Sequence, residues 1–171
     1  MILDAFRLDE KVAIVTGAVR GIDAEIARSF AEVGASLVCV VRTREALLRT
    51  CADAEAVGGR SIAVDRDLVA SDAPDRIVDA ALAAFGRIDV VVNISSGFAR
   101  AANIGSIPYG GAKAALEQLT FMPAMEYAPR IRVNAIRVGA VTTENMHPNL
   151  LAAMPGIGEK LIARADRLAG N

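Results

Sequence analysis

The segment KVAIVTGAVRGIDAEIARSFAEVG (residues 11–34) decides the fold, because it runs from a strand through a glycine-containing turn into a helix. Apolar residues dominate its first six positions, which predicts a strand buried on both faces of a sheet. The stretch AEIARSFAEVG has the pattern of an amphipathic helix, and Gly34 predicts its C-terminal cap. This order of elements is typical of the first unit of a parallel sheet.

The same alternation repeats along the chain. Short stretches rich in β-branched residues predict further strands at 36–41, 61–65, 88–93 and 130–138. Helical patterns lie at 44–59, at 73–86, from about Tyr109 to Glu126, and from about Met146. Pro123 is expected to kink the helix that contains it or to end that helix early. This order predicts an α/β fold: a three-layer, doubly wound parallel sheet of Rossmann-like type, in one domain over residues 1–171.

The charge and hydropathy of the chain exclude several classes of partner. The 171 residues carry a formal net charge of -1 and their arginines are scattered, which argues against nucleic acid or an anionic membrane surface. No apolar stretch approaches the roughly 20 residues of a membrane span. The first eleven residues also lack the apolar region of a signal peptide.

The few cysteines and the single histidine limit which disulfides, metal sites and catalytic triads the chain can form. The two cysteines, Cys39 and Cys51, make no disulfide framework, so a reduced, cytoplasmic protein is expected. The single histidine, His147, weighs against most zinc sites and against a Ser-His triad. No metal site is therefore predicted.

The turn after the first strand, TGAVRGIDAEIA, is a candidate phosphate-binding site. In a parallel sheet such a turn presents a helix N-terminus to a phosphate, and glycine lets the ligand approach the backbone closely. Thr16, Gly17 and Gly21 fit a T-G-x-x-x-G pattern, but Asp23 stands where a third glycine is expected. A carboxylate there can repel a pyrophosphate, although it also suits the helix dipole. A strand-helix turn without a ligand is the alternative.

Two arginines bear on which dinucleotide the turn would bind. Arg20 lies within the turn, and Arg42 follows the second strand, whose end lies beside the adenosine ribose in a Rossmann unit. No acidic residue stands there to bind a free 2′-hydroxyl, whereas a guanidinium group suits a 2′-phosphate. NADP(H) is therefore favoured over NAD(H); the alternative is a pair of solvated surface arginines.

Tyr109, Lys113 and the earlier Ser96 form a candidate catalytic set. At a spacing of four residues, the tyrosine and the lysine share one helix face. A tyrosine is a poor proton donor or acceptor at neutral pH unless a neighbouring cation favours its phenolate form. A loop hydroxyl thirteen residues earlier could bond a substrate carbonyl and stabilise developing charge. The alternative is a helix-start tyrosine, a solvated lysine and a turn-forming serine.

Six short motifs follow one another along the chain: TGAVRGI, VDRDLV, FGRIDVVVN, NISS, YGGAKAAL and IRVNAIRVGAVTTE. In these motifs and in their order the chain resembles the short-chain dehydrogenases/reductases over nearly its whole length. The resemblance implies hydride transfer between the nicotinamide of NADP(H), or NAD(H), and a small ketone or secondary alcohol. It also implies that Ser96, Tyr109 and Lys113 are catalytic, with Tyr109 as the general acid/base.

The glycine turn and the two arginines, together with residues that the resemblance implies, make up the candidate cofactor-binding set. They are Gly17, Arg20, Gly21, Ile22, Arg42, Asp67, Leu68, Asn93, Tyr109, Lys113 and Thr143. Within this set, Asp67 and Leu68 are expected beside the adenine and Asn93 beside the cofactor. Thr143 matches the threonine that binds the nicotinamide carboxamide.

The resemblance breaks where the fourth strand meets the serine motif. DVVVN and NISS are fused at Asn93, whereas the family has a long helix and a further strand between them. The missing piece is on the order of one βαβ crossover, about 30 residues or more. It would carry the family's catalytic asparagine and a helix that is usual in the family's oligomer interface. Its loss is expected to force the fourth strand beside the next one or to leave a hole.

The closing region departs from the family too. RADRLAGN stands where the family continues into another helix and a last strand, and VG at 138–139 replaces Pro-Gly. Three explanations stay open: a shortened paralogue that repacks, a decayed relative with little activity, or part of a longer chain. Exposed core and unpaired strand edges favour association, so a homo-oligomer is expected.

Two functional hypotheses follow from these observations. The first is an NADP(H)-dependent oxidoreductase for ketones or secondary alcohols, supported by the Ser-Tyr-Lys set and the two arginines. The second is a non-catalytic dinucleotide-binding or interaction module, supported by Asp23 and the shortened sheet. A purely structural, oligomerising role has no sequence feature behind it.

Overall fold

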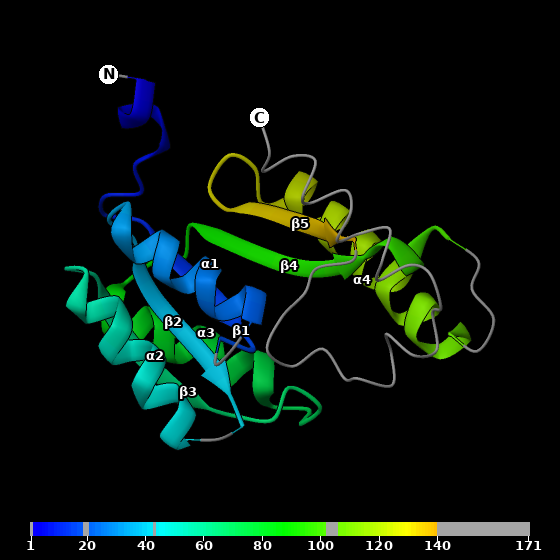
Figure 1. Cartoon of the computed structure of the whole chain (residues 1–171), viewed down its shortest axis with the longest axis horizontal. Coiled ribbons are helices and arrows are strands. Elements are labelled where there is room, and N and C mark those ends of the chain that lie inside the picture. Colours follow the sequence, from blue (N-terminus) through cyan, green and yellow to red (C-terminus); the bar gives the residue numbers. More distant parts are fainter. Residues whose placement is uncertain (1, 19–20, 43, 102–105, 140–171) are drawn as a thin grey trace, which may run out of the picture. The chain divides into compact units, whose positions relative to one another are not determined.

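The computed structural model describes residues 2–18, 21–42, 44–101 and 106–139 (Figure 1). The strands within them are β1 (Val12–Thr16), β2 (Ser36–Val41), β3 (Arg60–Asp65), β4 (Val90–Ser96) and β5 (Arg132–Val138). The α-helices are α1 (Gly21–Glu32), α2 (Arg44–Ala56), α3 (Ala73–Phe85) and α4 (Ile107–Glu126). Two short 3-10 helices are η1 (Ile2–Phe6) and η2 (Gly97–Ala99).

The chain divides into two units, Met1–Val138 and Gly139–Asn171. All the elements named above lie in the first unit. The helix expected from about Met146 lies outside the described residues, and the single domain over 1–171 stays a prediction. None of the described helices is both long and apolar enough to cross a membrane.

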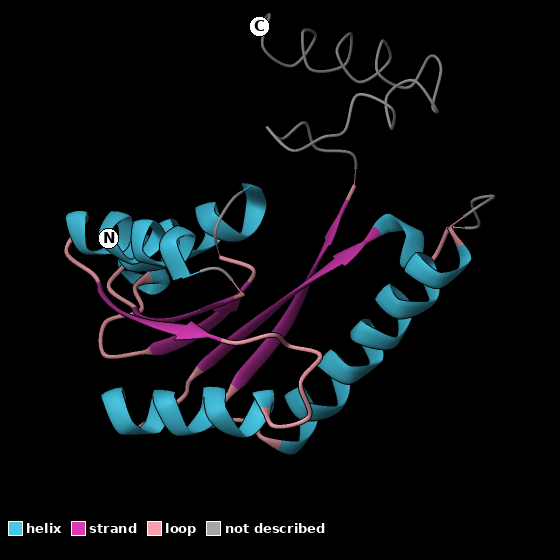
Figure 2. Cartoon of the chain, turned by 90° about the horizontal axis from the view of Figure 1, so that it is seen from below, coloured by secondary structure: helices cyan, strands magenta, loops and turns pink. Residues whose placement is uncertain are grey.

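The five strands form one parallel sheet in the order β3-β2-β1-β4-β5. Chain order reverses between β1 and β4, which is the switch point of a doubly wound sheet. In Figure 2 the helices lie on both faces of the sheet, with α3 and α4 together below it. The predicted three-layer, doubly wound α/β fold is therefore confirmed.

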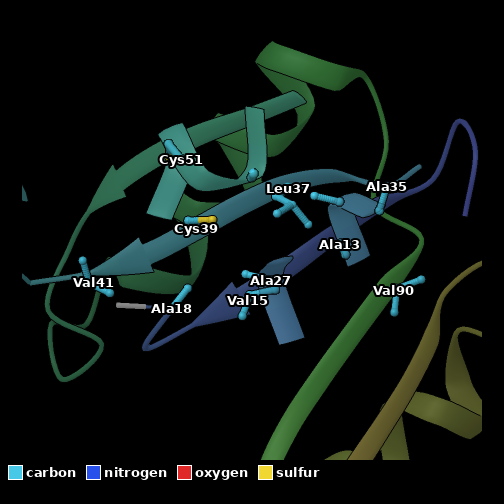
Figure 3. Close-up of a cluster of buried hydrophobic side chains, with 12 residues drawn as sticks. Ala13, Val15, Ala18, Ala27, Ala35, Leu37, Cys39, Val41, Cys51 and Val90 are labelled. Carbon is cyan, nitrogen blue, oxygen red and sulfur yellow. The ribbon is translucent and has the colours of Figure 1, made fainter. Parts of the chain in front are cut away.

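The core divides into two clusters, one on each face of the sheet. Alternate residues of a strand point to opposite faces, so Leu37 and Cys39 of β2 pack in the cluster that includes the alanines of α1 and α2 (Figure 3). Val38 and Val40 pack with Ile77 of α3 on the other face. Because β2 is covered on both faces, it reads in the sequence as an uninterrupted apolar stretch. Each of these buried aliphatic side chains stabilises the fold by about 1.5–3 kcal/mol.

The fused motif forms one continuous strand. The strand predicted at 88–93 instead spans Val90–Ser96, so it begins later and runs through the serines. Its first two residues, Val90 and Val91, are in register with β1, whereas all seven residues pair with β5. The fourth strand thus lies directly beside the next one, which was one of the two outcomes expected from the missing crossover.

The β4–β5 part of the sheet is less covered than the rest. Five of the seven residues of β5 are exposed, among them Ile136, whereas five of the six residues of β2 are buried. Among the described helices, α4 is the one that packs against β4 and β5, and a strand of a parallel sheet normally needs cover on both faces. Apolar surface therefore remains exposed at this end of the first unit.

Pro123 lies inside α4 and does not end it. The helix continues to Glu126, and the Tyr127 N–H then donates to the Pro123 carbonyl oxygen at 2.9 Å. The predicted end of this helix near Glu126 is confirmed, and of the two effects expected of Pro123 an early end does not occur. Proline lacks only its own N–H donor, so the carbonyl of Pro123 can still accept a bond in the final turn.

Candidate active site

The sheet brings most of the predicted site residues to one edge. Because all strands are parallel, the segments that follow them leave the sheet at the same edge. The glycine turn follows β1, Arg42 follows β2, Asp67 and Leu68 follow β3, and Ser96 ends β4. Arg20 and Thr143 lie outside the described residues, so their predicted roles stay predictions.

The turn between β1 and α1 has the backbone conformation that its glycines permit. Gly17 has φ 72° and Gly21 has φ 60°, in the left-handed region that side chains disfavour. The Gly17 N–H donates to the Val40 carbonyl oxygen at 2.8 Å, which fixes the turn to β2. The first N–H groups of α1 lack acceptors within the helix, so this turn can present donors to an anion. Ile22 is the second residue of this helix.

The carboxylate of Asp23 lies against the glycine turn. A Cβ built on Gly17 would lie 3.4 Å from Asp23 Oδ2, and the aspartate is partly buried. Burial raises the pKa of Asp23 above its usual value, and it outweighs the opposite effects of the Lys113 charge and of the aspartate's own backbone N–H. The positive charge of Lys113 partly offsets this effect of burial.

The ends of β2 and β3 form a second part of this edge. Val41 is in register with Asp65, so Arg42 and the turn after β3 leave the sheet next to each other. Asp67 Oδ1 accepts the Val69 N–H at 3.0 Å and so shapes that turn. Arg42 and Leu68 are both exposed. A guanidinium and an apolar side chain are thus accessible together at this edge.

Tyr109 and Lys113 lie on the first two turns of α4 and share a face, as their spacing predicts. Lys113 Nζ donates to the Ile94 carbonyl oxygen at 2.6 Å, and it lies 5.7 Å from the centre of the Tyr109 ring. The Tyr109 ring meets the Phe98 ring edge to face, with 5.9 Å between their centres. Tyr109 is 49% exposed, so a ligand can reach it.

Ser96 is joined to the tyrosine through Phe98. Its Oγ accepts the Phe98 N–H at 3.3 Å, while the Phe98 ring contacts Tyr109. In the described part of the chain, no hydrogen bond links Ser96 directly to Tyr109. The Ser96 hydroxyl hydrogen also has no acceptor among the described residues, so this group can donate to a ligand.

A partly exposed network around Glu117 supports the site, and the sequence reasoning missed it. Glu117 accepts two hydrogen bonds of 2.7 Å from Arg137, one of 3.3 Å from Arg100, and one of 2.9 Å from the Ser95 hydroxyl. The Arg137 guanidinium, above all, lowers the pKa of Glu117 to about 2. This network joins α4 to β5 and to the residues on either side of Ser96. One signal was present in the sequence, since Glu117 follows Lys113 at helical spacing.

Asn93 lies in the middle of β4 and not at the strand's end. Its Nδ2 donates to Thr120 Oγ1 at 2.9 Å, and the Thr120 hydroxyl donates to the Leu116 carbonyl oxygen at 2.7 Å. The side chain therefore fastens β4 to α4. Its implied place beside a cofactor stays a prediction.

The family of the chain follows from its sequence. The sequence model of the family described as short chain dehydrogenase matches residues 11–93 and 90–153. The chain belongs to this family. Residues 90–93 are contained in both matches, so they correspond to two separate places in the family pattern. This double match supports the interpretation that a family segment is absent at the fused strand β4.

Relatives and solved structures agree with this membership. An uncharacterized oxidoreductase from Mycobacterium tuberculosis (strain CDC 1551 / Oshkosh) is 32% identical over 194 residues, which cover 84% of this chain and 74% of that protein. A putative short-chain alcohol dehydrogenase from Sinorhizobium meliloti 1021 has a TM-score of 0.78 and 26% identity over 87% of this chain and 81% of that one. A 7 alpha-hydroxysteroid dehydrogenase, solved with NADH and 7-oxo glycochenodeoxycholic acid, has a TM-score of 0.78 and 25% identity over 88% and 80%.

Membership places this short-chain dehydrogenase among the oxidoreductases that use a nicotinamide dinucleotide. The glycine turn, the exposed Tyr109 and the free hydroxyl of Ser96 fit such a ligand. The carboxylate of Asp23 fits it less well, because it places a negative charge beside Gly17 of the turn. The described residues contain no group of three or more His, Cys, Asp or Glu side chains that could hold a metal ion.

Proposed function

We propose that this protein transfers a hydride between NADP(H) and a small ketone or secondary alcohol, with Tyr109 as general acid/base. One observation carries the proposal. The glycine turn follows β1 and Ser96 ends β4, two neighbouring parallel strands, while Lys113 lies 5.7 Å from the centre of the Tyr109 ring at the start of α4. The candidate proton-transfer group and the candidate dinucleotide turn therefore border the same space, as hydride transfer at a bound substrate requires.

The roles of the three side chains follow from their chemistry. When bound, the nicotinamide ring supplies or accepts the hydride. The Tyr109 hydroxyl gives a proton to the carbonyl oxygen in reduction and removes one from the alcohol in oxidation. The Lys113 ammonium, held by the Ile94 carbonyl, stabilises negative charge that develops nearby. The free hydroxyl hydrogen of Ser96 donates to the substrate oxygen and orients it.

Arg42 supports the preference for NADP(H) over NAD(H). Its guanidinium is exposed directly after β2, next to the turn that carries Asp67 and Leu68. A 2′-phosphate placed there would gain a charge-assisted hydrogen bond. The preference for NADP(H) is argued from Arg42 alone. It is not argued from the solved structures, one of which was solved with NADH.

The second candidate is a non-catalytic module that binds a dinucleotide or another protein. It is favoured by the partly buried carboxylate of Asp23 in the glycine turn and by the missing segment at β4. We further propose that the chain forms a homo-oligomer, supported by the apolar surface of β5 and α4. A reducing, cytoplasmic location is supported by the two cysteines, both free and buried.

The experiment that separates the candidates compares the chain's two tyrosines. NADPH binding is followed by its fluorescence, and turnover is then measured over a panel of small ketones and aldehydes. Tyr109→Phe should keep NADPH binding and lower kcat by roughly 100- to 10,000-fold. Tyr127→Phe, the matched control at the end of α4, should leave kcat unchanged.

Two outcomes would contradict the proposal. Absence of NADPH and NADH binding to the wild-type chain would remove the oxidoreductase and weaken the binding module. Binding without turnover on any carbonyl would favour the non-catalytic module. Separately, equal turnover in wild type and Tyr109→Phe would show that Tyr109 is not the general acid/base.

A further inference from the structure

Asp23 places a carboxylate next to the turn that would receive the phosphates of a dinucleotide. Asp23 lies on the first turn of α1, and its Oδ2 would be 3.4 Å from a Cβ atom built on Gly17. Gly17 and Gly21 both have left-handed φ values, which is the backbone arrangement that opens the turn to a phosphate. The carboxylate thus borders the open side of Gly17.

The electrostatics of this position favour one negative charge and disfavour two. The N-terminus of α1 carries a partial positive charge that suits an anion. The backbone N–H of Asp23 already stabilises that residue's own carboxylate. From α4, Lys113 adds a positive charge but is bonded to the Ile94 carbonyl. Glu25 of the same helix pairs with Arg28 on the exposed surface, and Arg20 of the turn lies outside the described residues.

We propose that the Asp23 carboxylate occupies the pyrophosphate position of the glycine turn, so that a dinucleotide binds together with one proton taken up by Asp23. This inference rests on the proposed function and names how its cofactor site is regulated. A pyrophosphate beside an ionised carboxylate meets like-charge repulsion in a partly buried place. Protonation removes that repulsion and turns the carboxyl group into a hydrogen-bond donor toward the phosphate oxygens.

The pH dependence follows in sign from this linkage. Burial already raises the pKa of Asp23 in the free protein, and a nearby pyrophosphate raises it further. Between the pKa of the free protein and that of the complex, the complex binds more protons, so affinity falls as pH rises. The slope approaches tenfold per pH unit at most, for one coupled proton.

The test uses the full chain and NADH, which lacks the 2′-phosphate that would itself titrate near pH 6. Calorimetric titrations at pH 5.5, 6.5 and 7.5, in buffers of different ionisation enthalpy, give both the affinity and the protons taken up. The wild type should take up close to one proton at pH 7.5 and bind more weakly there than at pH 5.5. Asp23→Asn should bind NADH at least about tenfold tighter than the wild type at pH 7.5, without proton uptake.

Matched controls keep the outcomes distinct. Glu25→Gln removes an acidic group from the same helix but from its exposed side, and it should behave like the wild type, since Arg28 keeps its ion pair with Glu32 at 2.5 Å. Adenosine, which has no pyrophosphate, should bind wild type and Asp23→Asn equally. Melting temperatures verify that each variant is folded.

The failures of the two proposals can be told apart. If wild type and Asp23→Asn bind NADH equally at every pH, or if binding takes up no proton, the carboxylate does not occupy the pyrophosphate position and the proposed function stands. If neither chain, nor Asp23→Gly, binds NADH or NADPH, the proposed function is wrong and this inference is wrong with it.

Discussion

At the scale of single residues, Asp89 joins the starts of three strands. Its Oδ2 accepts the Val12 N–H at 3.0 Å, and its own backbone N–H donates to the Val12 carbonyl oxygen while its carbonyl accepts the Arg132 N–H. Arg87 donates to both carboxylate oxygens, at 2.8 and 2.6 Å. Burial alone would raise the pKa of Asp89, but the bonds from Arg87 and Val12 outweigh it and lower that pKa.

Replacing Asp89 should therefore destabilise the sheet. Asp89→Ala leaves the buried Val12 N–H without an acceptor, which costs about 1–3 kcal/mol of unfolding free energy. Asp89→Asn keeps an acceptor oxygen and should lose less. Urea unfolding at pH 7 measures both losses, and equal stability of wild type and Asp89→Ala would contradict the account. Since the folded pKa is lowered, the stabilisation should be full above the unfolded pKa of about 3.9 and be lost as pH falls below it.

Arg42 carries a second prediction at this scale. If its guanidinium binds the 2′-phosphate, Arg42→Ala should weaken NADPH binding by roughly 10- to 100-fold and leave NADH binding nearly unchanged. Arg49, exposed on α2, provides the control substitution Arg49→Ala. Fluorescence titrations with both dinucleotides decide the matter. An equal loss for NADPH and NADH would show that Arg42 does not read the 2′-phosphate.

At the scale of elements, Glu117 connects the helix that carries Tyr109 to the strand at the sheet's edge. Its four hydrogen bonds reach β4, Arg100 just after η2, and β5, so one carboxylate links α4 to both neighbouring strands. The helix α4 and the strand β5 are therefore held together by polar bonds as well as by apolar contact.

Glu117→Gln should lower the melting temperature at neutral pH, because the amide cannot replace the charge that Arg137 and Arg100 pair with. The pKa of Glu117 is about 2 in the folded chain and about 4.3 unfolded, so the stabilisation is full above pH 4.3 and is lost as pH falls toward 2. Thermal unfolding of both chains at pH 7 and pH 3 measures this. The gap between the two melting temperatures should shrink at pH 3; a constant gap would mean that Glu117 acts by packing alone.

The elements also show what a sequence can and cannot predict. The strands 36–41 and 61–65 were predicted within one residue, because each is a short apolar stretch, rich in β-branched residues, that closely follows a glycine. The pair Tyr109 and Lys113 was predicted because helical spacing is local. The bonds of Asn93 to Thr120 and of Glu117 to Arg137 were not, because they join residues that the fold alone brings together.

At the scale of the molecule, the missing segment explains both the sheet and its exposed surface. The strands β4 and β5 pair along their whole length, whereas β4 is in register with β1 only at Val90 and Val91. The helix α4, however, leaves Leu119, Phe121 and Met125 each at least 60% exposed. Exposed apolar side chains gathered on one element mark surfaces that associate.

Self-association through α4 is therefore expected, and it can be weakened without unfolding the helix. Phe121→Glu combined with Met125→Lys places an attractive pair at helical spacing and removes two apolar side chains. Val78→Glu with Leu82→Lys makes the same change on α3, where the side chains are less exposed. Sedimentation at several concentrations should show an oligomer for wild type and the α3 variant, and a shift to monomer for the α4 variant. A wild-type chain that stays monomeric at every concentration, or equal association in all three, would show that another surface governs the assembly or that none does.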